Sequence, residues 1–156
     1  DDASGASIYD WSLTSITGEI YSTRYSNSIT WGNVNCSNIT TLEQENLNMN
    51  HTNSQDNISK TFTGGTHASF VLSGTIIASN SCRTLNTYIG NATQDTDFEE
   101  VALFELYRNS TIYAAILENE VQGFDSNRYD FQMIVPEIGL DTFTGSTAYY
   151  LYVEIT

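Results

Sequence analysis

The sequence predicts an all-β fold, and three observations lead to that prediction. Apolar and polar residues alternate with a period of two along most of the chain, a pattern typical of strands that bury one face. Tyr, Thr, Ile, Val and Phe, which suit a pleated surface, are abundant, and helical periodicity is nearly absent. A chain of 156 residues with 40 % hydrophobic content is long enough for one domain with a substantial core.

Six strands are predicted in the first half of the chain, where short alternating runs are separated by polar or glycine-containing turns. The pair Gly64-Gly65 supplies the clearest of these turns, because glycine tolerates the backbone angles that tight turns require. The predicted strands cover residues 7–16, 19–25, 28–34, 47–51, 59–63 and 68–79.

Five further strands are predicted in the second half, with turns at Gly90-Asn91 and Gly123. Residues 98–119 contain an apolar run that would also fit a helix, but Asn109-Ser110 between two apolar stretches favours a hairpin turn. The strands cover residues 83–89, 100–108, 111–118, 128–135 and 148–155, and the single proline, Pro136, is expected to end one of them.

The last strand, within residues 147–156, is apolar on both faces. Such a two-sided pattern predicts a central or covered position rather than a free edge. Many short strands without an internal repeat or linker favour a β-sandwich as the architecture.

Asn-X-Ser/Thr triplets are unusually frequent, and each is an acceptor for an N-linked glycan. They predict surface asparagines in an exported protein, since a bulky sugar cannot enter a packed core. Because Ser, Thr and Asn are abundant, several such triplets would also arise from composition alone. The candidate glycosylation sites are Asn35, Asn38, Asn50, Asn57, Asn91 and Asn109.

The two cysteines, Cys36 and Cys82, are predicted to form a disulfide, because exported domains with one cysteine pair usually oxidise it. A pair of buried free thiols is the alternative. Neither a membrane-spanning apolar run nor a signal-peptide pattern is found in the sequence. We therefore expect an extracellular, cell-surface chain whose signal peptide has been removed, without membrane insertion of the mature chain.

Charge is the second informative feature, with 19 acidic against five basic side chains and a formal net charge of -14 at pH 7. A nucleic acid partner is not expected, because a polyanion would be repelled and no basic stripe offsets that repulsion. Only 15 % of the residues are charged, so the polarity comes mainly from groups that do not titrate. This composition suits an acidic medium, with a neutral extracellular medium as the alternative.

The N-terminal segment has two interpretations. After a polar lead, Tyr9, Trp11 and Leu13 fall on one face of an extended strand. The segment is then either the first strand of its own sheet or a donor strand that completes the sheet of a neighbouring copy. Donation would give a head-to-tail homopolymer, because such a contact does not close. The candidate donor residues are Ala6, Ile8, Tyr9, Trp11 and Leu13, and the receiving groove would be walled by the C-terminal strand.

The N-terminus Asp-Asp-Ala-Ser-Gly-Ala-Ser-Ile-Tyr-Asp-Trp, the clustered glycan acceptors, the single cysteine pair and the low charge together resemble subunits of the archaeal thread filaments of thermoacidophiles. The resemblance implies a glycosylated pilus-like surface filament that serves adhesion, to a cell-surface or abiotic target, or biofilm formation. It further implies an immunoglobulin-like, type-I-pilin-like β-sandwich head over residues 16–156 and a donor tail over residues 1–15. Archaeal bundling pilins with jelly-roll heads share the donor-strand principle and remain an alternative.

Covalent cross-linking between subunits is a further hypothesis, through an amide between an amine and an Asn or Asp side chain. The sequence narrows it to two amines, because Lys60 is the single lysine and Asp1 carries the α-amine. Intact mass after full denaturation and reduction would detect such a bond.

No catalytic constellation is recognised in the sequence. His51 and His67 lie in polar, turn-rich surroundings and are interpreted as solvated surface histidines. The acidic residues Asp95, Asp97 and Glu99 match a calcium loop poorly, and Glu99 and Glu100 should point to opposite faces of a strand, which is unsuitable for glycoside hydrolysis. We expect no enzymatic activity, no metal site and no cofactor beyond covalent N-linked glycans.

Two hypotheses on function remain. The first is a structural subunit of an extracellular filament that polymerises head to tail through its N-terminal strand. The alternative is a self-contained extracellular β-sandwich binding module, such as a surface-layer, adhesin or carbohydrate-recognition domain. In that module exposed aromatic residues such as Trp11 and Trp31 would stack on sugars.

Overall fold

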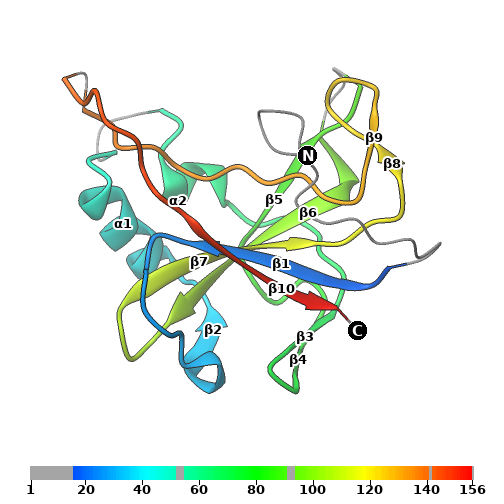
Figure 1. Ribbon diagram of the computed structural model, residues 1–156, viewed down its shortest axis with the longest axis horizontal. Coiled ribbons are helices and arrows are strands. Elements are labelled where there is room, and N and C mark those ends of the chain that lie inside the picture. The colour runs from blue at the N-terminus through cyan, green and yellow to red at the C-terminus, as the bar shows by residue number, and fades with distance from the viewer. Residues whose placement is uncertain (1–15, 52–54, 91–93, 141, 156) are drawn as a thin grey trace.

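The computed structural model describes residues 16–51, 55–90, 94–140 and 142–155 (Figure 1). Antiparallel strands dominate it, which confirms the all-β prediction at the level of fold class. The elements are β1 (Gly18–Thr23), η1 (Trp31–Asn33), β2 (Val34–Cys36), α1 (Ile39–Asn48), α2 (Ile58–Thr61), β3 (Phe70–Leu72), β4 (Thr75–Ile77), β5 (Thr84–Tyr88), β6 (Gln94–Glu105), β7 (Ser110–Ile116), β8 (Val121–Gln122), β9 (Arg128–Tyr129) and β10 (Tyr150–Ile155).

A six-stranded sheet organises the molecule, with the hairpin of β6 and β7 at its centre. β1 pairs with β7 and β10 with β1, so the order across the sheet is β10-β1-β7-β6-β2. β5 shares the outer side of β6 with β2, because β5 pairs with the first part of β6 and β2 with its end. The turn predicted near Asn109 is confirmed, and Asn109 adopts a φ of 53°, which asparagine tolerates better than most residues.

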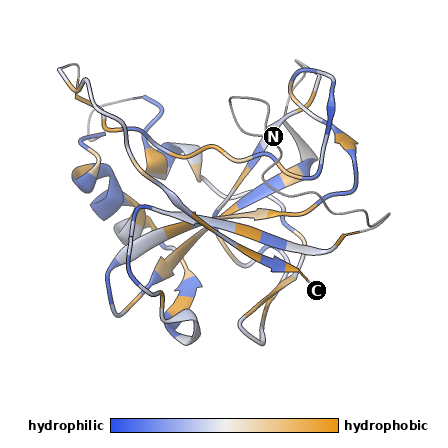
Figure 2. Ribbon diagram, viewed as in Figure 1, coloured by the Kyte–Doolittle hydropathy of each residue, from blue (hydrophilic) through white to orange (hydrophobic). Residues whose placement is uncertain are grey.

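Alternation along the central strands sends side chains into two separate cores. Val101, Leu103 and Ile112 face the β3–β4 hairpin on one side of the sheet. Ala102 and Tyr113 face α1 and α2 on the other side. Figure 2 shows hydrophobic stretches on β7 and on α2 that correspond to this second core. The helices contribute Leu42, Met49, Ile58 and Phe62 to it.

Residues 131–138 cross the helix-bearing side of the sheet without joining it, and we call them the crossing segment (Figure 1). The strand predicted over residues 128–135 is therefore wrong beyond Tyr129. The backbone N–H of Ile134 donates to the side chain of Glu100 at 2.8 Å rather than to a neighbouring strand. Apolar residues of the crossing segment still pack on the cores, namely Phe131, Met133, Val135 and Ile138.

The strand predicted over residues 47–51 is wrong, because this stretch contains the end of helix α1. The helix begins at Asn38, whose side chain accepts the N–H of Thr41 at 3.0 Å and so satisfies an unpaired helix donor. Leu42 and Met49 lie seven residues apart and are both fully buried, as the helical period requires. The prediction considered Asn38 as a glycan acceptor alone and overlooked its capping role.

The strand predicted over residues 59–63 is also wrong, because these residues lie largely in helix α2, which has an asparagine N-cap like α1. Asn57 begins helix α2 and accepts the N–H of Lys60 at 3.0 Å. Two other predicted strands are interrupted. Residues 28–34 contain the short η1 helix before β2, and residues 68–79 fold back at Ser73-Gly74, where both φ angles are positive, to form the β3–β4 hairpin.

The predicted disulfide between Cys36 and Cys82 is confirmed, with a Cα–Cα distance of 5.0 Å. It joins the end of β2 to the residues that precede β5, and Cys82 belongs to the core beneath the β3–β4 hairpin. The predicted first strand, residues 7–16, lies outside the described residues except for Ile16, which is buried.

Candidate functional site

Among the described residues the C-terminal strand β10 is an edge strand, so the predicted central or covered position is not found there. β10 pairs with β1 along its whole length, and no described residue pairs with its other side. Leu151, Val153 and Ile155 lie on one face and are 48 %, 37 % and 43 % exposed. The apolar pattern that predicted a covered strand thus belongs to a strand with one strand partner, β1, among the described residues.

Natural edge strands are usually protected by lysine, proline, a β-bulge or a covering loop, because their free N–H and C=O groups recruit other strands. β10 reads Tyr-Leu-Tyr-Val-Glu-Ile and contains neither lysine nor proline. Its register with β1 runs without a bulge, and its one charged residue, Glu154, lies opposite Glu19. The edge therefore has the composition of a strand that accepts another strand.

Gly18 is required where β10 ends beside β1. It has a φ of 142°, and a Cβ at this position would lie 2.0 Å from the carbonyl oxygen of Glu154. The close approach of the two backbones fixes the end of the β1–β10 pair. Gly18, the first residue of β1, lies opposite Ile155, the last residue of β10.

Two carboxyl groups face each other across the β1–β10 pair. The hydroxyl of Tyr21 contacts Glu154 Oε2 at 3.3 Å and Glu19 Oε2 at 3.4 Å. Burial and, to a smaller extent, the charge of Glu154 raise the pKa of Glu19 to about 7, although hydrogen bonds from Tyr21 and the backbone of Val71 lower it. Burial and the same two carboxylates raise the pKa of Tyr21 well above its ordinary value, so its hydroxyl keeps its proton.

A third carboxyl, that of Glu100, is fully buried on the opposite side of the sheet. Its Oε2 accepts the N–H of Ile134 at 2.8 Å, while its Oε1 has no hydrogen-bond partner among the described residues. Burial raises the pKa of Glu100 to about 8. The hydroxyl of Tyr113 is also buried without a partner and lies near enough for the charge of Glu100 to act on it. At acidic and neutral pH the carboxyl group of Glu100 is therefore mainly protonated and uncharged.

Glu99 and Glu100 point to opposite faces of β6, as predicted. Glu99 Oε2 accepts the N–H of Ala68 at 2.6 Å, on the side of the β3–β4 hairpin, whereas Glu100 meets the crossing segment. Burial raises the pKa of Glu99 and also that of Glu118, which the charges of Asp97 and Glu99 raise further. Glu99 and Glu100 therefore bind different segments on opposite sides of the sheet.

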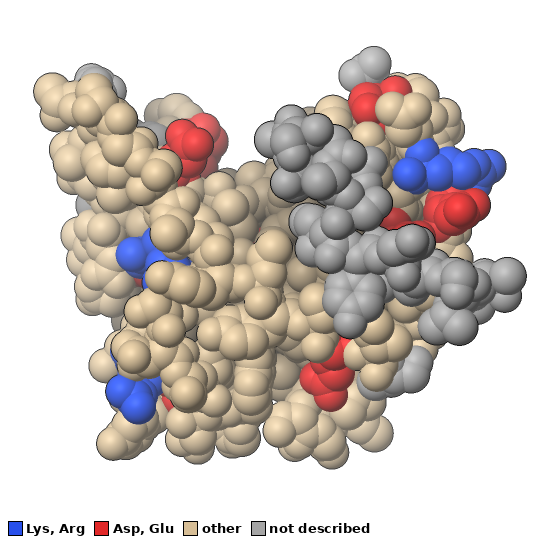
Figure 3. All heavy atoms as spheres, in the orientation of Figure 1, with Lys and Arg blue, Asp and Glu red and all other residues tan. Residues whose placement is uncertain are grey.

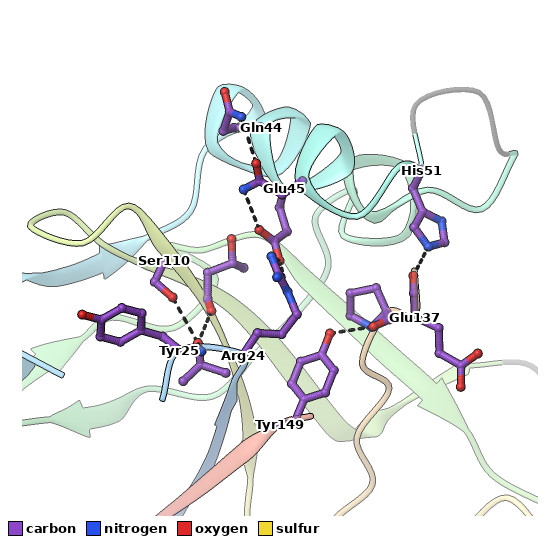
Figure 4. A network of polar contacts seen from close by, with 12 residues as sticks. Arg24, Tyr25, Gln44, Glu45, His51, Ser110, Glu137 and Tyr149 are labelled. Carbon is purple, nitrogen blue, oxygen red and sulfur yellow. Dashed lines mark hydrogen bonds and ion pairs between the residues drawn. The ribbon is translucent and has the colours of Figure 1, made fainter. Parts of the chain in front are cut away.

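Polar contacts attach α1 and the crossing segment to residues next to β1 and β10 (Figure 4). Arg24, which follows β1, donates to Glu45 Oε1 of α1 from Nε at 3.0 Å and from Nη2 at 2.7 Å. The hydroxyl of Tyr149, which precedes β10, donates to the carbonyl of Pro136 at 2.6 Å. The end of the β1–β10 pair at Thr23 and Tyr150 is thereby held to α1 and to the crossing segment.

The interpretation of both histidines as solvated is wrong for His67, which is 2 % exposed. Its Nε2 accepts the N–H of Cys82 at 3.0 Å, and its Nδ1 donates to the carbonyl of Ala68 at 2.7 Å. The ring thus supports the backbone beside the disulfide. His51 is partly exposed and its Nε2 donates to the carbonyl of Glu137.

The described glycan acceptors lie on several elements of the fold. Asn35 lies on β2, at the far side of the sheet, and Asn38 and Asn50 flank α1. Asn109 lies in the β6–β7 turn, and Asn91 lies outside the described residues. The exposed acceptors among the described residues are Asn35, Asn38, Asn50 and Asn109.

Asn57 differs from these four, because it is 6 % exposed and its Oδ1 accepts from Lys60 N–H and from the hydroxyl of Ser59. We expect Asn57 to be unmodified in the folded protein, since a glycan needs a path to solvent. Glycopeptide mass spectrometry of secreted material should find sugar on Asn35 and Asn38 but not on Asn57. Full occupancy of Asn57 would contradict this prediction.

Several predicted site residues lie beyond the structural description. The donor residues Ala6, Ile8, Tyr9, Trp11 and Leu13, and the amine of Asp1, are outside the described residues. Lys60 is exposed on α2, so its part in a cross-link stays a prediction. The ring of Trp31 packs against the rings of Tyr21 and Tyr152, with centroid distances of 5.0 and 5.4 Å. These contacts within the fold use part of the ring surface that would stack on a sugar.

Charged side chains are sparse on the face seen in Figure 3, and most of that surface is neutral. Within the described ranges, no group of three or more His, Cys, Asp or Glu side chains is arranged to hold a metal ion, and no helix is long and apolar enough to span a membrane. Comparisons with protein-family models, curated proteins and solved structures find no match.

Proposed function

We propose that this chain is a structural subunit of an extracellular, pilus-like filament, in which the N-terminal strand of one copy adds to β10 of the next. The observation that carries this proposal is the largely apolar edge of β10, which contains neither lysine nor proline and with which no described residue pairs. An edge of this kind is a template for strand addition, and it is stable in a soluble protein when a partner strand covers it.

The N-terminal sequence has the features that such a partner needs. Tyr9, Trp11 and Leu13 alternate with smaller residues, which would give one apolar face to an added strand. Residues 1–15 would extend about 45 to 50 Å at about 3.3 Å per residue, more than twice the length of the six-residue β10. The tail is therefore long enough to cover the whole edge after crossing between subunits.

The positions of the chain ends favour a linear polymer. The tail precedes β1 at Gly18, which is opposite Ile155 at the end of β10. A tail that leaves one copy at this end and pairs with β10 of another copy makes a heterologous contact, and repetition of such a contact gives an open filament. Exposed glycan acceptors such as Asn35 lie on the far side of the sheet, so sugars there would leave β10 accessible.

In this proposal the head is an immunoglobulin-like, type-I-pilin-like β-sandwich over residues 16–156 that the incoming strand completes. The role is structural rather than catalytic, and the partner is a further copy of the same chain. Adhesion or biofilm formation is the function that the resemblance to archaeal thread subunits adds, and it is proposed on that ground alone.

The test compares three variants of the full chain by negative-stain electron microscopy and size-exclusion chromatography. Deletion of residues 1–13 removes the donor, and Leu151→Lys places a charge on the acceptor edge. Both are expected to give folded monomers where the wild type gives filaments. Ile76→Lys is the matched control, because Ile76 is 74 % exposed on β4, away from β10.

Mixing provides the sharper result. The deletion variant keeps the acceptor and Leu151→Lys keeps the donor, so an equimolar mixture should give a dimer although neither variant polymerises alone. Filaments formed by the deletion variant as readily as by the wild type would show that the N-terminal strand is not the joint.

A further inference from the structure

We propose that Glu19, Glu154 and Tyr21 form a proton-dependent latch, which holds β10 on β1 in acid and releases it when both carboxyls are ionised. The latch is a property of the single chain. Its consequence for assembly rests on the proposed function, because β10 is the strand that would receive the tail of another copy.

The geometry places the three groups at one point between the two strands. Glu19 and Glu154 are directly opposite each other in the antiparallel register, and side chains in such pairs are close neighbours. The Tyr21 hydroxyl lies at 3.3 and 3.4 Å from one oxygen of each carboxyl group. Glu19 is 4 % exposed and Tyr21 is 1 % exposed, so water screens this contact poorly.

The groups packed around Glu19 do not neutralise a second negative charge. β10 contributes Glu154, β1 contributes the neutral hydroxyl of Tyr21, and β3 contributes the backbone of Val71 as a hydrogen-bond donor. On β7 the residue opposite Glu19 is the apolar Ile116. None of these four neighbours is a cation, so ionisation of both carboxyls leaves two like charges facing each other across the strand pair.

The gain or loss of one proton decides whether the two carboxyl groups attract or repel each other. When one carboxyl is protonated, its O–H can donate to the other carboxylate, and the Tyr21 hydroxyl can donate to the same acceptor. When both are ionised, Tyr21 supplies one O–H for two anions that repel each other. The pKa of Glu19, raised to about 7, lies above its unfolded value of 4.5, so this contribution to stability is complete below pH 4.5 and is lost as the pH rises through 7.

The expected consequence is local. β10 has β1 as its one strand partner among the described residues, so loss of this contact opens the sheet edge. The β6–β7 hairpin is paired on both sides and should stay closed under the same conditions. In the proposed filament, the acceptor edge would then be intact in acid and weakened above neutrality.

The test is hydrogen–deuterium exchange of the full chain at pH 5 and pH 8, with rates corrected for the intrinsic pH dependence of amide exchange. In the wild type, the open fraction of β10 and β1 amides should rise by at least about tenfold between the two pH values, because each unit of pKa shift corresponds to a tenfold change in the equilibrium. Amides of β6 and β7 should change far less. Glu154→Gln should keep β10 protected at pH 8, because the amide can donate to Glu19 and carries no charge.

A matched control is Glu43→Gln, which removes an exposed carboxyl from α1 and should behave as the wild type. Equal protection of β10 at pH 5 and pH 8 in the wild type would overturn the latch, as would a Glu154→Gln variant that opens as the wild type does. Microscopy of the same samples separates this proposal from the proposed function. Filaments with a pH-independent β10 would overturn the latch alone, whereas a pH-dependent β10 without filaments at either pH would support the latch and contradict the filament.

Discussion

Replacement of Glu100 by Gln is expected to remove a large part of the pH dependence of folding stability between pH 4 and pH 8. It should make the protein about 3 kcal/mol more stable than the wild type at pH 7, with little change at pH 4. The reason is the complete burial of a carboxyl whose pKa is raised to about 8. Glutamine keeps an oxygen that can accept the N–H of Ile134 but has no proton to lose.

The sign follows from proton linkage. The pKa of Glu100 is higher in the folded chain than its value of 4.5 in the unfolded chain, so the folded state holds this proton more tightly between pH 4.5 and pH 8. Stability from this group is therefore fully present below pH 4.5 and is lost as the pH rises through 8. Raised pKa values at Glu19, Glu99 and Glu118 act in the same direction, which fits the expectation of an acidic medium.

Urea denaturation at pH 4, 6 and 8, followed by circular dichroism, measures this effect in the wild type, Glu100→Gln and the exposed control Glu43→Gln. The control should retain the wild-type slope, and Glu100→Gln should retain a weaker slope from the other carboxyls. If wild-type stability increases from pH 4 to pH 8, or if Glu100→Gln keeps the full slope, then Glu100 is not a buried neutral acid.

Removal of the disulfide is the second large effect. A Cys36→Ala/Cys82→Ala double variant should lose about 4 kcal/mol of unfolding free energy, because the bond closes a loop between residues separated by 46 positions. The double variant avoids a lone thiol in the core, where Cys82 is 7 % exposed. Both its stability and that of the oxidised wild type should be measured at pH 4, where the buried carboxyls contribute fully.

The reduced wild type is the internal control for that comparison. If the covalent constraint is responsible, reduction should cost nearly as much as the double substitution, since the chain entropy of the unfolded state changes in the same way. A loss below about 1 kcal/mol in both cases would show that β2 and the residues before β5 are held together by their packing instead.

Much of the strand content was predictable because it depends on patterns of residues that are neighbours in the sequence. Asn109-Ser110 between two apolar runs predicted the hairpin of β6 and β7, although the run around Val101 would also fit a helix. The helices were missed although their signals are also local. Asn38 and Asn57 are N-caps within short polar stretches, and their membership in glycan-acceptor triplets concealed that role.

By itself, the sequence determined the all-β class, the central hairpin and the cysteine pair. The first two depend on short-range patterns, and the chain has two cysteines, so one pairing is available. The tertiary structure alone decided that β10 is an edge, that Glu100 and His67 are buried, and that Glu19 meets Glu154. These properties depend on which distant segments lie side by side. No local pattern carries that information, because the exposure and the charge environment of a side chain are set by neighbours far along the chain.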